Sequence, residues 1–226
     1  DANANDSSGN GYNGTLTSGA AIDTTAGTNK IGAGKLSLDG VNDYVDLSAH
    51  KTNFTALTQG TISAWIKTAD TTATIFYMSD TADADSEAGI WISGGKVEFS
   101  VWEANAALLR VQSTALVNDN VWHHVAVTVD GTGNKLYIDG VAAAVTRRTG
   151  TAATQKFFSD VTGVNSLTIG TTFGLSGQSY QFNGLIDDVR VYDRALSAAD
   201  IAQLAPNSAP TLGNGTLAAV NEDTAS

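Results

Sequence analysis

Short stretches of alternating apolar and polar residues recur along most of this 226-residue chain, and no other feature constrains its fold as strongly. TISAWIK places Ile62, Ala64 and Ile66 on one side of a strand, with Trp65 and polar residues on the other. The same spacing recurs in KVEFSVW, VAVTVDG, KLYIDG, SLTIG and LIDDVRVY. Because successive side chains of a strand point to opposite faces, this pattern is typical of strands with one buried face.

Turn-forming residues separate these stretches at short intervals. Asp-Gly pairs follow several predicted strands, and Ser93-Gly94-Gly95 stands between two others as a tight hairpin. A parallel sheet would need crossover helices, which the pattern does not contain. The sequence therefore predicts an all-β fold, a two-sheet antiparallel sandwich of the jelly-roll kind. One short helix is predicted at LSAADIAQL, where Ser197 and Asp200 form a capping box.

The composition excludes several classes of function. The chain has no cysteine, so disulfides, thiolate metal sites and a thiol nucleophile are ruled out. Its formal net charge is −11, with 23 acidic and 12 basic residues, and such a surface repels nucleic acid and anionic membranes. No apolar run approaches the ~18 residues of a membrane span. We therefore expect neither a nucleic-acid partner nor membrane insertion.

Both prolines of the chain, Pro206 and Pro210, follow the predicted helix within a polar stretch. Such a stretch is typical of a linker and places the end of the sandwich at residue 205. We interpret residues 1–205 as one domain and residues 206–226 as a linker and the start of a following module. Because no leader or initiator Met precedes Asp1, we interpret the chain as a segment of a longer protein.

Four segments occur in the order and register of laminin G-like, concanavalin A-like jelly rolls: GKLSLDGVNDYVDL, GTISAWIKT, VWHHVAVTVDGTGNKLYIDG and FNGLIDDVRVYDRALSAADI. The trailing NSAPTLGNGTLAAVNEDTAS resembles the opening of the cadherin-like or immunoglobulin-like repeats of long bacterial adhesins, such as those of the RTX type. The first resemblance implies a secreted or surface-borne sandwich, commonly with a structural calcium ion and often with a glycan ligand. It does not by itself imply catalysis.

The opening DANANDSSGNGYNG is rich in oxygen ligands but matches neither an EF-hand nor a phosphate-binding loop. It lacks the glycine and glutamate that an EF-hand has at positions 6 and 12, and no GK[ST] follows it. It resembles the N-terminal loop of the laminin G-like family. That resemblance implies that Asp6, Asn10 and Asn13 supply oxygens to a calcium ion.

A second carboxylate is expected at this ion, because calcium prefers six to eight oxygens and usually several carboxylates. Strict alternation along LIDDVRVY puts Asp187 in a row with three aliphatic residues, where an unpaired charge is costly. The first and last strands of related jelly rolls are neighbours, which implies that Asp6 and Asp187 share one ion. In the alternative, Asp187 accepts backbone N–H groups at a β-bulge.

Two tryptophans are predicted on polar faces of strands. Trp102 shares its face with Glu98, and the tight hairpin at residues 93–96 brings Trp91 to the same face. Flat rings beside carboxylate, amide and guanidinium groups suit sugar binding, because C–H surfaces stack on the rings while hydroxyls find polar partners. In the alternative, the tryptophans plug a sheet edge under a loop. The predicted ligand contacts on these strands and their turn are Trp91, Glu98, Trp102, Asn105 and Arg110.

Two further ligand contacts are predicted in TTFGLSGQSYQ, read as a flexible Gly/Ser loop of 11 residues. It offers Phe173 and Tyr180. Long loops at the ends of a sandwich carry function more often than strands do, and in relatives of this family end loops are usual glycan sites.

Glucanases share the concanavalin A-like fold, which raises the possibility of catalysis. Glycoside hydrolysis normally requires two carboxylates about 5–10 Å apart. The laminarinase-type spacing ExDxxE is absent from this sequence, and Asp187 and Asp188 are expected to point to opposite faces. We therefore expect no catalysis. Three hypotheses remain: a monomeric, calcium-stabilised glycan-binding module of a cell-surface adhesin, a structural spacer in such a protein, and, least favoured, a hydrolase.

Overall fold

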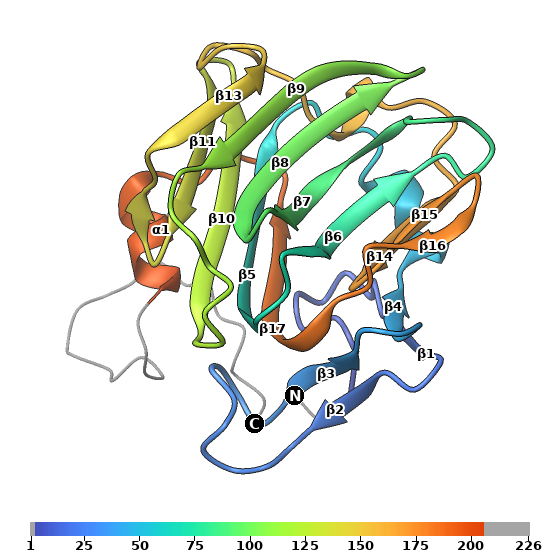
Figure 1. The fold of residues 1–226 in the computed structure, drawn as a ribbon, viewed down its shortest axis with the longest axis vertical. Helices are drawn as coiled ribbons and strands as arrows, with labels where there is room; N and C mark the ends of the chain where they lie inside the picture. Colours follow the sequence, from blue (N-terminus) through green and yellow to red (C-terminus); the bar gives the residue numbers. More distant parts are fainter. Residues whose placement is uncertain (1–2, 206–226) are drawn as a thin grey trace.

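The computed structural model describes residues 3–205, which form two packed sheets with one short α-helix (Figure 1). Every strand pair in this range is antiparallel. The predicted all-β sandwich is therefore confirmed. The predicted linker and following module at residues 206–226 lie outside the described residues.

Eight strands form one layer, in the order β1-β4-β14-β6-β7-β8-β9-β13. Their bounds are β1 (Thr15–Thr17), β4 (Tyr44–Asp46), β14 (Ser166–Ile169), β6 (Thr72–Ser79), β7 (Glu87–Ser93), β8 (Lys96–Glu103), β9 (Ala106–Ser113) and β13 (Val145–Thr149). A hairpin of β15 (Thr172–Gly174) and β16 (Gly177–Ser179) lies beside this sheet (Figure 1).

Seven strands form the other layer, in the order β12-β11-β10-β5-β17-β3-β2. Their bounds are β12 (Val141–Ala142), β11 (Gly133–Ile138), β10 (His123–Asp130), β5 (Gly60–Thr68), β17 (Asn183–Tyr192), β3 (Lys35–Asp39) and β2 (Ala21–Asp23). Two 3-10 helices complete the connections, η1 (Ser48–Asn53) and η2 (Phe158–Asp160).

The core lies between the two sheets and is built from the apolar half of each alternating strand. Ile62 and Ile66 of β5 and Phe99 of β8 are fully buried, as the alternation predicts. Phe157 and Phe158 close the core with stacked rings whose centres are 4.3 Å apart. Burying such side chains contributes about 1.5–3 kcal/mol each.

The prediction of strict alternation through LIDDVRVY is wrong. A β-bulge between Asp187 and Arg190, with Asp188 at a φ of 51°, shifts the phase of β17 by one residue. Ile186 before the bulge and Val189 after it both pack on the core. Asp187 therefore points to the outer side of the seven-stranded sheet rather than into a row of aliphatic residues.

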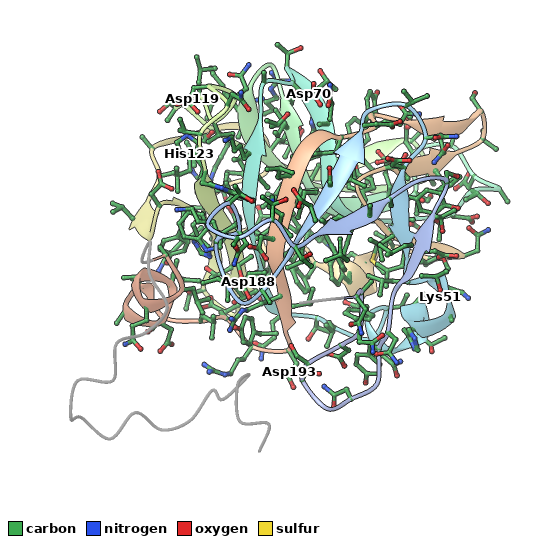
Figure 2. The ribbon with its side chains drawn as sticks, turned by 90° about the horizontal axis from the view of Figure 1, so that it is seen from below. Lys51, Asp70, Asp119, His123, Asp188 and Asp193 are labelled. Carbon is green, nitrogen blue, oxygen red and sulfur yellow. The ribbon has the colours of Figure 1, made fainter. Side chains whose placement is uncertain are left out.

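The outer side of the seven-stranded sheet is partly covered by helix α1 (Ala198–Leu204). Ser197 and Asp200 form the predicted capping box, with bonds of 3.0 and 3.2 Å to each other's backbone N–H groups. Ile201 belongs to a small buried cluster with Ala126 of β10 and Tyr137 of β11. No helix within residues 3–205 is long and apolar enough to cross a membrane. Figure 2 shows the same layers from below, with Asp188 near the bulge of β17.

Candidate functional site

Polar and aromatic side chains gather on the face of the eight-stranded sheet that points away from the core. The strands alternate here, so buried aliphatic residues are followed by residues that point outward. We call the outward set the tryptophan face. It consists of Tyr77 from β6, Glu87, Gly89 and Trp91 from β7, Glu98, Ser100 and Trp102 from β8, Arg110 and Gln112 from β9, and Arg148 from β13.

The turn between β7 and β8 fixes the register of this face. Gly94 and Gly95 have φ values of 60° and 74°, the left-handed backbone that a tight hairpin needs and that glycine adopts without strain. The register places Trp91 opposite Glu98, as the sequence predicts, and Trp102 four residues away along the strands. That spacing separates the two tryptophan positions by about 13 Å.

Glu98 is completely buried although it lies on an outer face. Its Oε1 accepts hydrogen bonds from Nε and a terminal nitrogen of Arg110 at 2.8 and 2.7 Å. Its Oε2 lies 3.8 Å from Nε of Arg148. Glu98 therefore has no exposed surface in this structure, and its role as a ligand contact stays a prediction. It holds the guanidinium of Arg110 at a fixed place on the face.

A β-bulge brings Arg148 onto this face. The register between β13 and β9 shifts between Arg147 and Thr149, and bulges commonly re-aim a side chain in this way. Arg148 donates to Oε1 of Gln112 at 3.4 Å. Its side chain is 46% exposed, so its guanidinium remains open to a molecule on the face.

Trp102 marks one end of the tryptophan face. Its ring centre lies 5.3 Å from the guanidinium carbon of Arg110, a cation–π contact. On the neighbouring strands Tyr77 donates to Glu87 at 3.0 Å and lies 3.3 Å from the hydroxyl of Ser100. Burial and the nearby Glu87 charge raise the pKa of Tyr77 well above its usual value, and burial also raises the pKa of Glu87. Tyr77 is therefore a neutral, fixed hydroxyl in the floor of the face.

Trp91 marks the other end and is joined by Tyr180. Their ring centres are 5.4 Å apart at an angle of 37°, and Tyr180 is 49% exposed. The carbonyl of Tyr180 accepts the N–H of Thr74 at 2.8 Å, which ties this tyrosine to β6. The structure thus brings together two aromatic residues that lie 89 positions apart in the sequence.

The remaining two predicted contacts are Phe173 and Asn105. TTFGLSGQSYQ contains the hairpin β15–β16 rather than an irregular loop, because its residues pair from Thr172 to Ser179. Phe173 packs edge-on against Tyr44, at 5.2 Å, and so does not join Trp91. Asn105 is exposed in the β8–β9 turn, with a φ of 64°.

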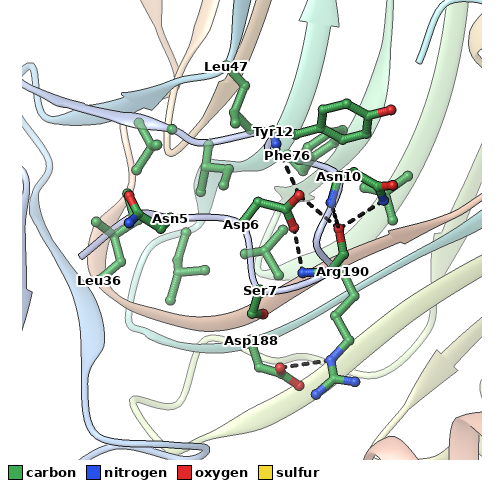
Figure 3. A pocket seen from close by; sticks show the side chains of 18 of the residues that line it. Asn5, Asp6, Ser7, Asn10, Tyr12, Leu36, Leu47, Phe76, Asp188 and Arg190 are labelled. Carbon is green, nitrogen blue, oxygen red and sulfur yellow. Dashed lines mark hydrogen bonds and ion pairs between the residues drawn. The ribbon is translucent and has the colours of Figure 1, made fainter. Parts of the chain in front are cut away.

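The N-terminal loop is closed by the carboxylate of Asp6 (Figure 3). Asp6 accepts from the N–H and hydroxyl of Ser8 at 2.9 and 2.8 Å and from the N–H of Tyr12 at 3.0 Å. Partial burial would raise the pKa of Asp6, but these hydrogen bonds outweigh it and lower the pKa. Asn13 Oδ1 accepts the N–H of Asp6, and Asn10 donates its amide to Ser8.

Asp187 lies in the lining of the same cavity as Asp6, a space of about 740 Å³ between the N-terminal loop and β17. Its Oδ2 accepts the N–H groups of Lys30 and Ile31 at 2.7 and 3.0 Å. Burial raises the pKa of Asp187, helped by the charge of Asp188 and opposed by these N–H groups. This is the bulge alternative that the sequence left open.

These contacts do not fit a calcium ion shared by Asp6 and Asp187. The oxygens of Asp6 and Asn13 already accept protein donors, and Asp187 is occupied by a different loop. Within residues 3–205 no three acidic or histidine side chains are grouped so as to hold a metal. The calcium site at Asp6, Asn10, Asn13 and Asp187 stays a prediction.

The comparison with known proteins agrees with the fold. A family model described as the concanavalin A-like lectin/glucanases superfamily matches residues 39–202, well over half of the chain. The chain belongs to this superfamily. The match ends inside helix α1 and covers the whole tryptophan face. This confirms the resemblance that the sequence motifs indicate.

Among solved structures, this concanavalin A-like chain is similar to the CBM40 domain of the Ruminococcus gnavus IT-sialidase bound to α2,3-sialyllactose. The TM-score is 0.63 and the sequence identity is 23%, and the match covers 76% of this chain and 95% of that one. It is also similar to domain 4 of AbnA, a GH43 extracellular arabinanase from Geobacillus stearothermophilus in complex with arabinotriose. There the TM-score is 0.62 and the identity 21%, over 90% of this chain and 93% of that one. At these identities the likeness shows the fold.

One curated relative is the anhydrosialidase of Macrobdella decora, 44% identical over 48 residues. The match covers 21% of this chain and only 6% of the length of that protein.

Sequence reasoning missed five members of the tryptophan face: Tyr77, Glu87, Gly89, Gln112 and Arg148. The register of β6 against β7 shifts between Thr74 and Phe76. Simple alternation of side chains along β6 therefore does not predict that Tyr77 points outward. Gly89 gives the Tyr77 ring its room, since a Cβ there would collide with that ring. Arg148 is 50 residues from Glu98, and nothing local in VTRRT indicates that contact.

Proposed function

We propose that this domain is a non-catalytic carbohydrate-binding module that holds a glycan on the tryptophan face. One observation carries the proposal: two partly exposed tryptophans, about 13 Å apart, flank arginines that a buried glutamate holds in place. Sugar rings offer apolar C–H faces for stacking and hydroxyls for fixed polar partners. The face supplies both.

The rigidity of the polar groups favours binding of a structured ligand. Arg110 is fixed by two bonds to Glu98, and Tyr77 by its bond to Glu87. Fixed donors cost little conformational entropy when a ligand arrives. Arg148 adds a more exposed guanidinium, which suits hydroxyl or carboxylate oxygens.

The similar structures support the same ligand class, because one is described as bound to sialyllactose and another as in complex with arabinotriose. We further propose that the module belongs to an extracellular bacterial surface protein of the adhesin kind. Support for that setting comes from the resemblance of residues 207–226 to adhesin repeats, and from the similarity to a domain of an extracellular arabinanase.

The carboxylates of the face support a role without catalysis. Glu87 and Glu98 are the two carboxylates of the face, and each is held by a protein partner, because Glu87 accepts the Tyr77 hydroxyl and Glu98 binds Arg110. Glu98 is also fully buried beneath Arg110 and cannot reach a glycosidic oxygen.

The proposal is tested by a glycan array followed by calorimetric titration of the best ligands, with 3′-sialyllactose, 6′-sialyllactose and arabinotriose included. We expect binding that Trp91→Ala and Trp102→Ala each weaken at least tenfold, equivalent to about 1.4 kcal/mol. Val141→Ala is the matched control, because this residue is exposed on the other sheet. A protein that folds but binds nothing on the array contradicts the proposal and favours a structural spacer.

A further inference from the structure

Three side chains from neighbouring strands lie side by side on the outer face of the seven-stranded sheet, in a row that runs across the strands. β17 pairs Leu185 with Lys67 of β5, and β10 pairs His123 with Ile66, which sets Trp122 opposite Lys67. Ile66 points into the core. Trp122, Lys67 and Leu185 therefore lie together on the outer side, each partly exposed. In Figure 2 the neighbouring His123 marks this end of β10.

The loop of residues 24–34, between β2 and β3, forms a wall beside this row. It is pinned where Lys30 and Ile31 donate to Asp187, and where Nζ of Lys30 lies 4.3 Å from the ring centre of Trp65. Between loop and row remains a cavity of about 700 Å³, a size typical of small-ligand sites. It is lined by Trp122, Lys67 and Leu185 on one side and by Thr25, Asn29 and Lys30 on the other.

The charges around this cavity favour an anion. Three of the 12 basic side chains line it, in a chain of net charge −11. Lys35 is neutralised by Asp23 at 2.7 Å. In the range that the structure describes, Lys67 and Lys30 have no ion-pair partner. Burial lowers the pKa of Lys30 against the attraction of Asp139, so a bound anion would stabilise its charge.

We propose that this cavity is a second binding site that takes a carboxylate carried on a sugar-sized ring, such as a uronate. The carboxylate lies between the ammonium groups of Lys67 and Lys30, and the apolar face of the ring lies on Trp122 and Leu185. A bare inorganic anion would leave that apolar wall unused, and a neutral sugar would leave two ammonium groups unpaired. The site is on the opposite sheet from the tryptophan face and does not depend on it.

Indole resonances test this proposal directly, because the chain has four tryptophans. In a ¹⁵N–¹H correlation spectrum of the whole chain, assigned with Trp122→Phe, we expect sodium glucuronate to shift the Trp122 indole peak in a saturable way. Glucose and sodium acetate at equal ionic strength should shift it at least fivefold less. Added NaCl should weaken the binding, because screening weakens the lysine contacts.

The variants separate charge from shape. Lys67→Gln should raise the apparent Kd for glucuronate at least fivefold, Lys67→Arg should retain binding, and Lys135→Gln, at an exposed position of the same sheet, should change nothing. An unmoved Trp122 peak, equal shifts with glucose, or unchanged binding in a folded Lys67→Gln protein would overturn the proposal. The Trp91 and Trp102 peaks report separately on the tryptophan face, so the two proposals fail independently.

Discussion

On the outer side of the eight-stranded sheet Tyr77, Glu98 and Ser100 are buried, whereas the two tryptophans and the arginines of the tryptophan face are partly or fully exposed. Helix α1 and the loop of residues 24–34 cover much of the outer side of the other sheet. Each side buries charged groups, and one on each side has a side-chain ion-pair partner. Glu98 is fully buried beneath arginines that remain accessible, and the Lys35 side chain is 1% exposed beside a single aspartate. The same strand alternation thus gives two accessible guanidinium groups over a buried carboxylate on one face, and a buried ammonium group beside an exposed carboxylate on the other.

The largest expected effect comes from removing the cation that neutralises Glu98. Arg110→Met leaves a buried carboxylate whose other cation, Arg148, is 3.8 Å away. Breaking one partner of a buried pair typically costs about 3–5 kcal/mol, so we expect the free energy of unfolding to fall by that amount in urea titrations.

Two controls sharpen this test. Combining Glu98→Gln with Arg110→Met should recover at least half of the lost stability, because no charge is then buried alone. Arg194→Met should cost less than about 0.5 kcal/mol, since Arg194 is an exposed residue 3.9 Å from Asp200. A loss below about 1 kcal/mol for Arg110→Met would show that Glu98 does not need this partner.

On the covered face, His124 makes stability depend on pH. Burial lowers its pKa to about 4, with Arg190 adding to and Asp139 opposing that shift. Both ring nitrogens lack a hydrogen-bond partner among the described residues. His124 is protonated below about pH 6.5 in the unfolded chain, but only below about pH 4 in the folded chain. Stability should therefore fall by about 3 kcal/mol as the pH drops through this window.

Urea unfolding of the parent protein and of His124→Gln at pH 7 and pH 4.5 measures that effect. The variant should lose less stability on acidification than the parent. Equal losses in both proteins would assign the acid sensitivity to other groups. Glu87 and Asp187 act in the opposite direction, because their raised pKa values make the folded state the stronger proton binder.

A smaller effect is expected from Gly89 in the floor of the open face. A Cβ there would collide with the Tyr77 ring and the carbonyl of Phe76, so Gly89→Ala should cost about 1–3 kcal/mol and displace Tyr77. Gly131→Ala is the matched control, because a Cβ at Gly131 meets nothing within 4 Å. Thermal melts of both variants check this expectation; equal melting temperatures would contradict it.

The smallest effect is expected from calcium. Because Asp6 already accepts three protein donors, 5 mM CaCl₂ in place of EDTA should shift the melting temperature by less than about 2 °C. A larger rise that is lost in both Asp6→Asn and Asp187→Asn would instead establish the predicted calcium site.

Local sequence signals predicted the fold and part of the tryptophan face. Gly94 and Gly95 require a tight turn, and that turn alone sets Trp91 opposite Glu98. The capping box at Ser197 likewise needs only residues three positions apart. Such features are short-range, and their geometry follows from the residues themselves.

Long-range contacts could not be predicted in this way. Arg148 lies 3.8 Å from Glu98, at the bulge of β13. The outward orientation of Asp187 depends on another bulge, in β17. The residues of LIDDV alone do not show which side of the strand faces the core. Tyr180 meets Trp91 through the placement of a hairpin that the sequence suggested was a flexible loop.

The most direct test of the account is a titration of the ¹⁵N-labelled chain with 3′-sialyllactose, 6′-sialyllactose and arabinotriose, followed through the four indole N–H peaks. We predict that at least one of these glycans shifts the Trp91 and Trp102 peaks in a saturable way, and that arabinotriose, which has no carboxylate, leaves the peak of Trp65, which is 2% exposed, in place. Unmoved Trp91 and Trp102 peaks with all three glycans, or shifts confined to the opposite sheet, would contradict the assignment of the binding face.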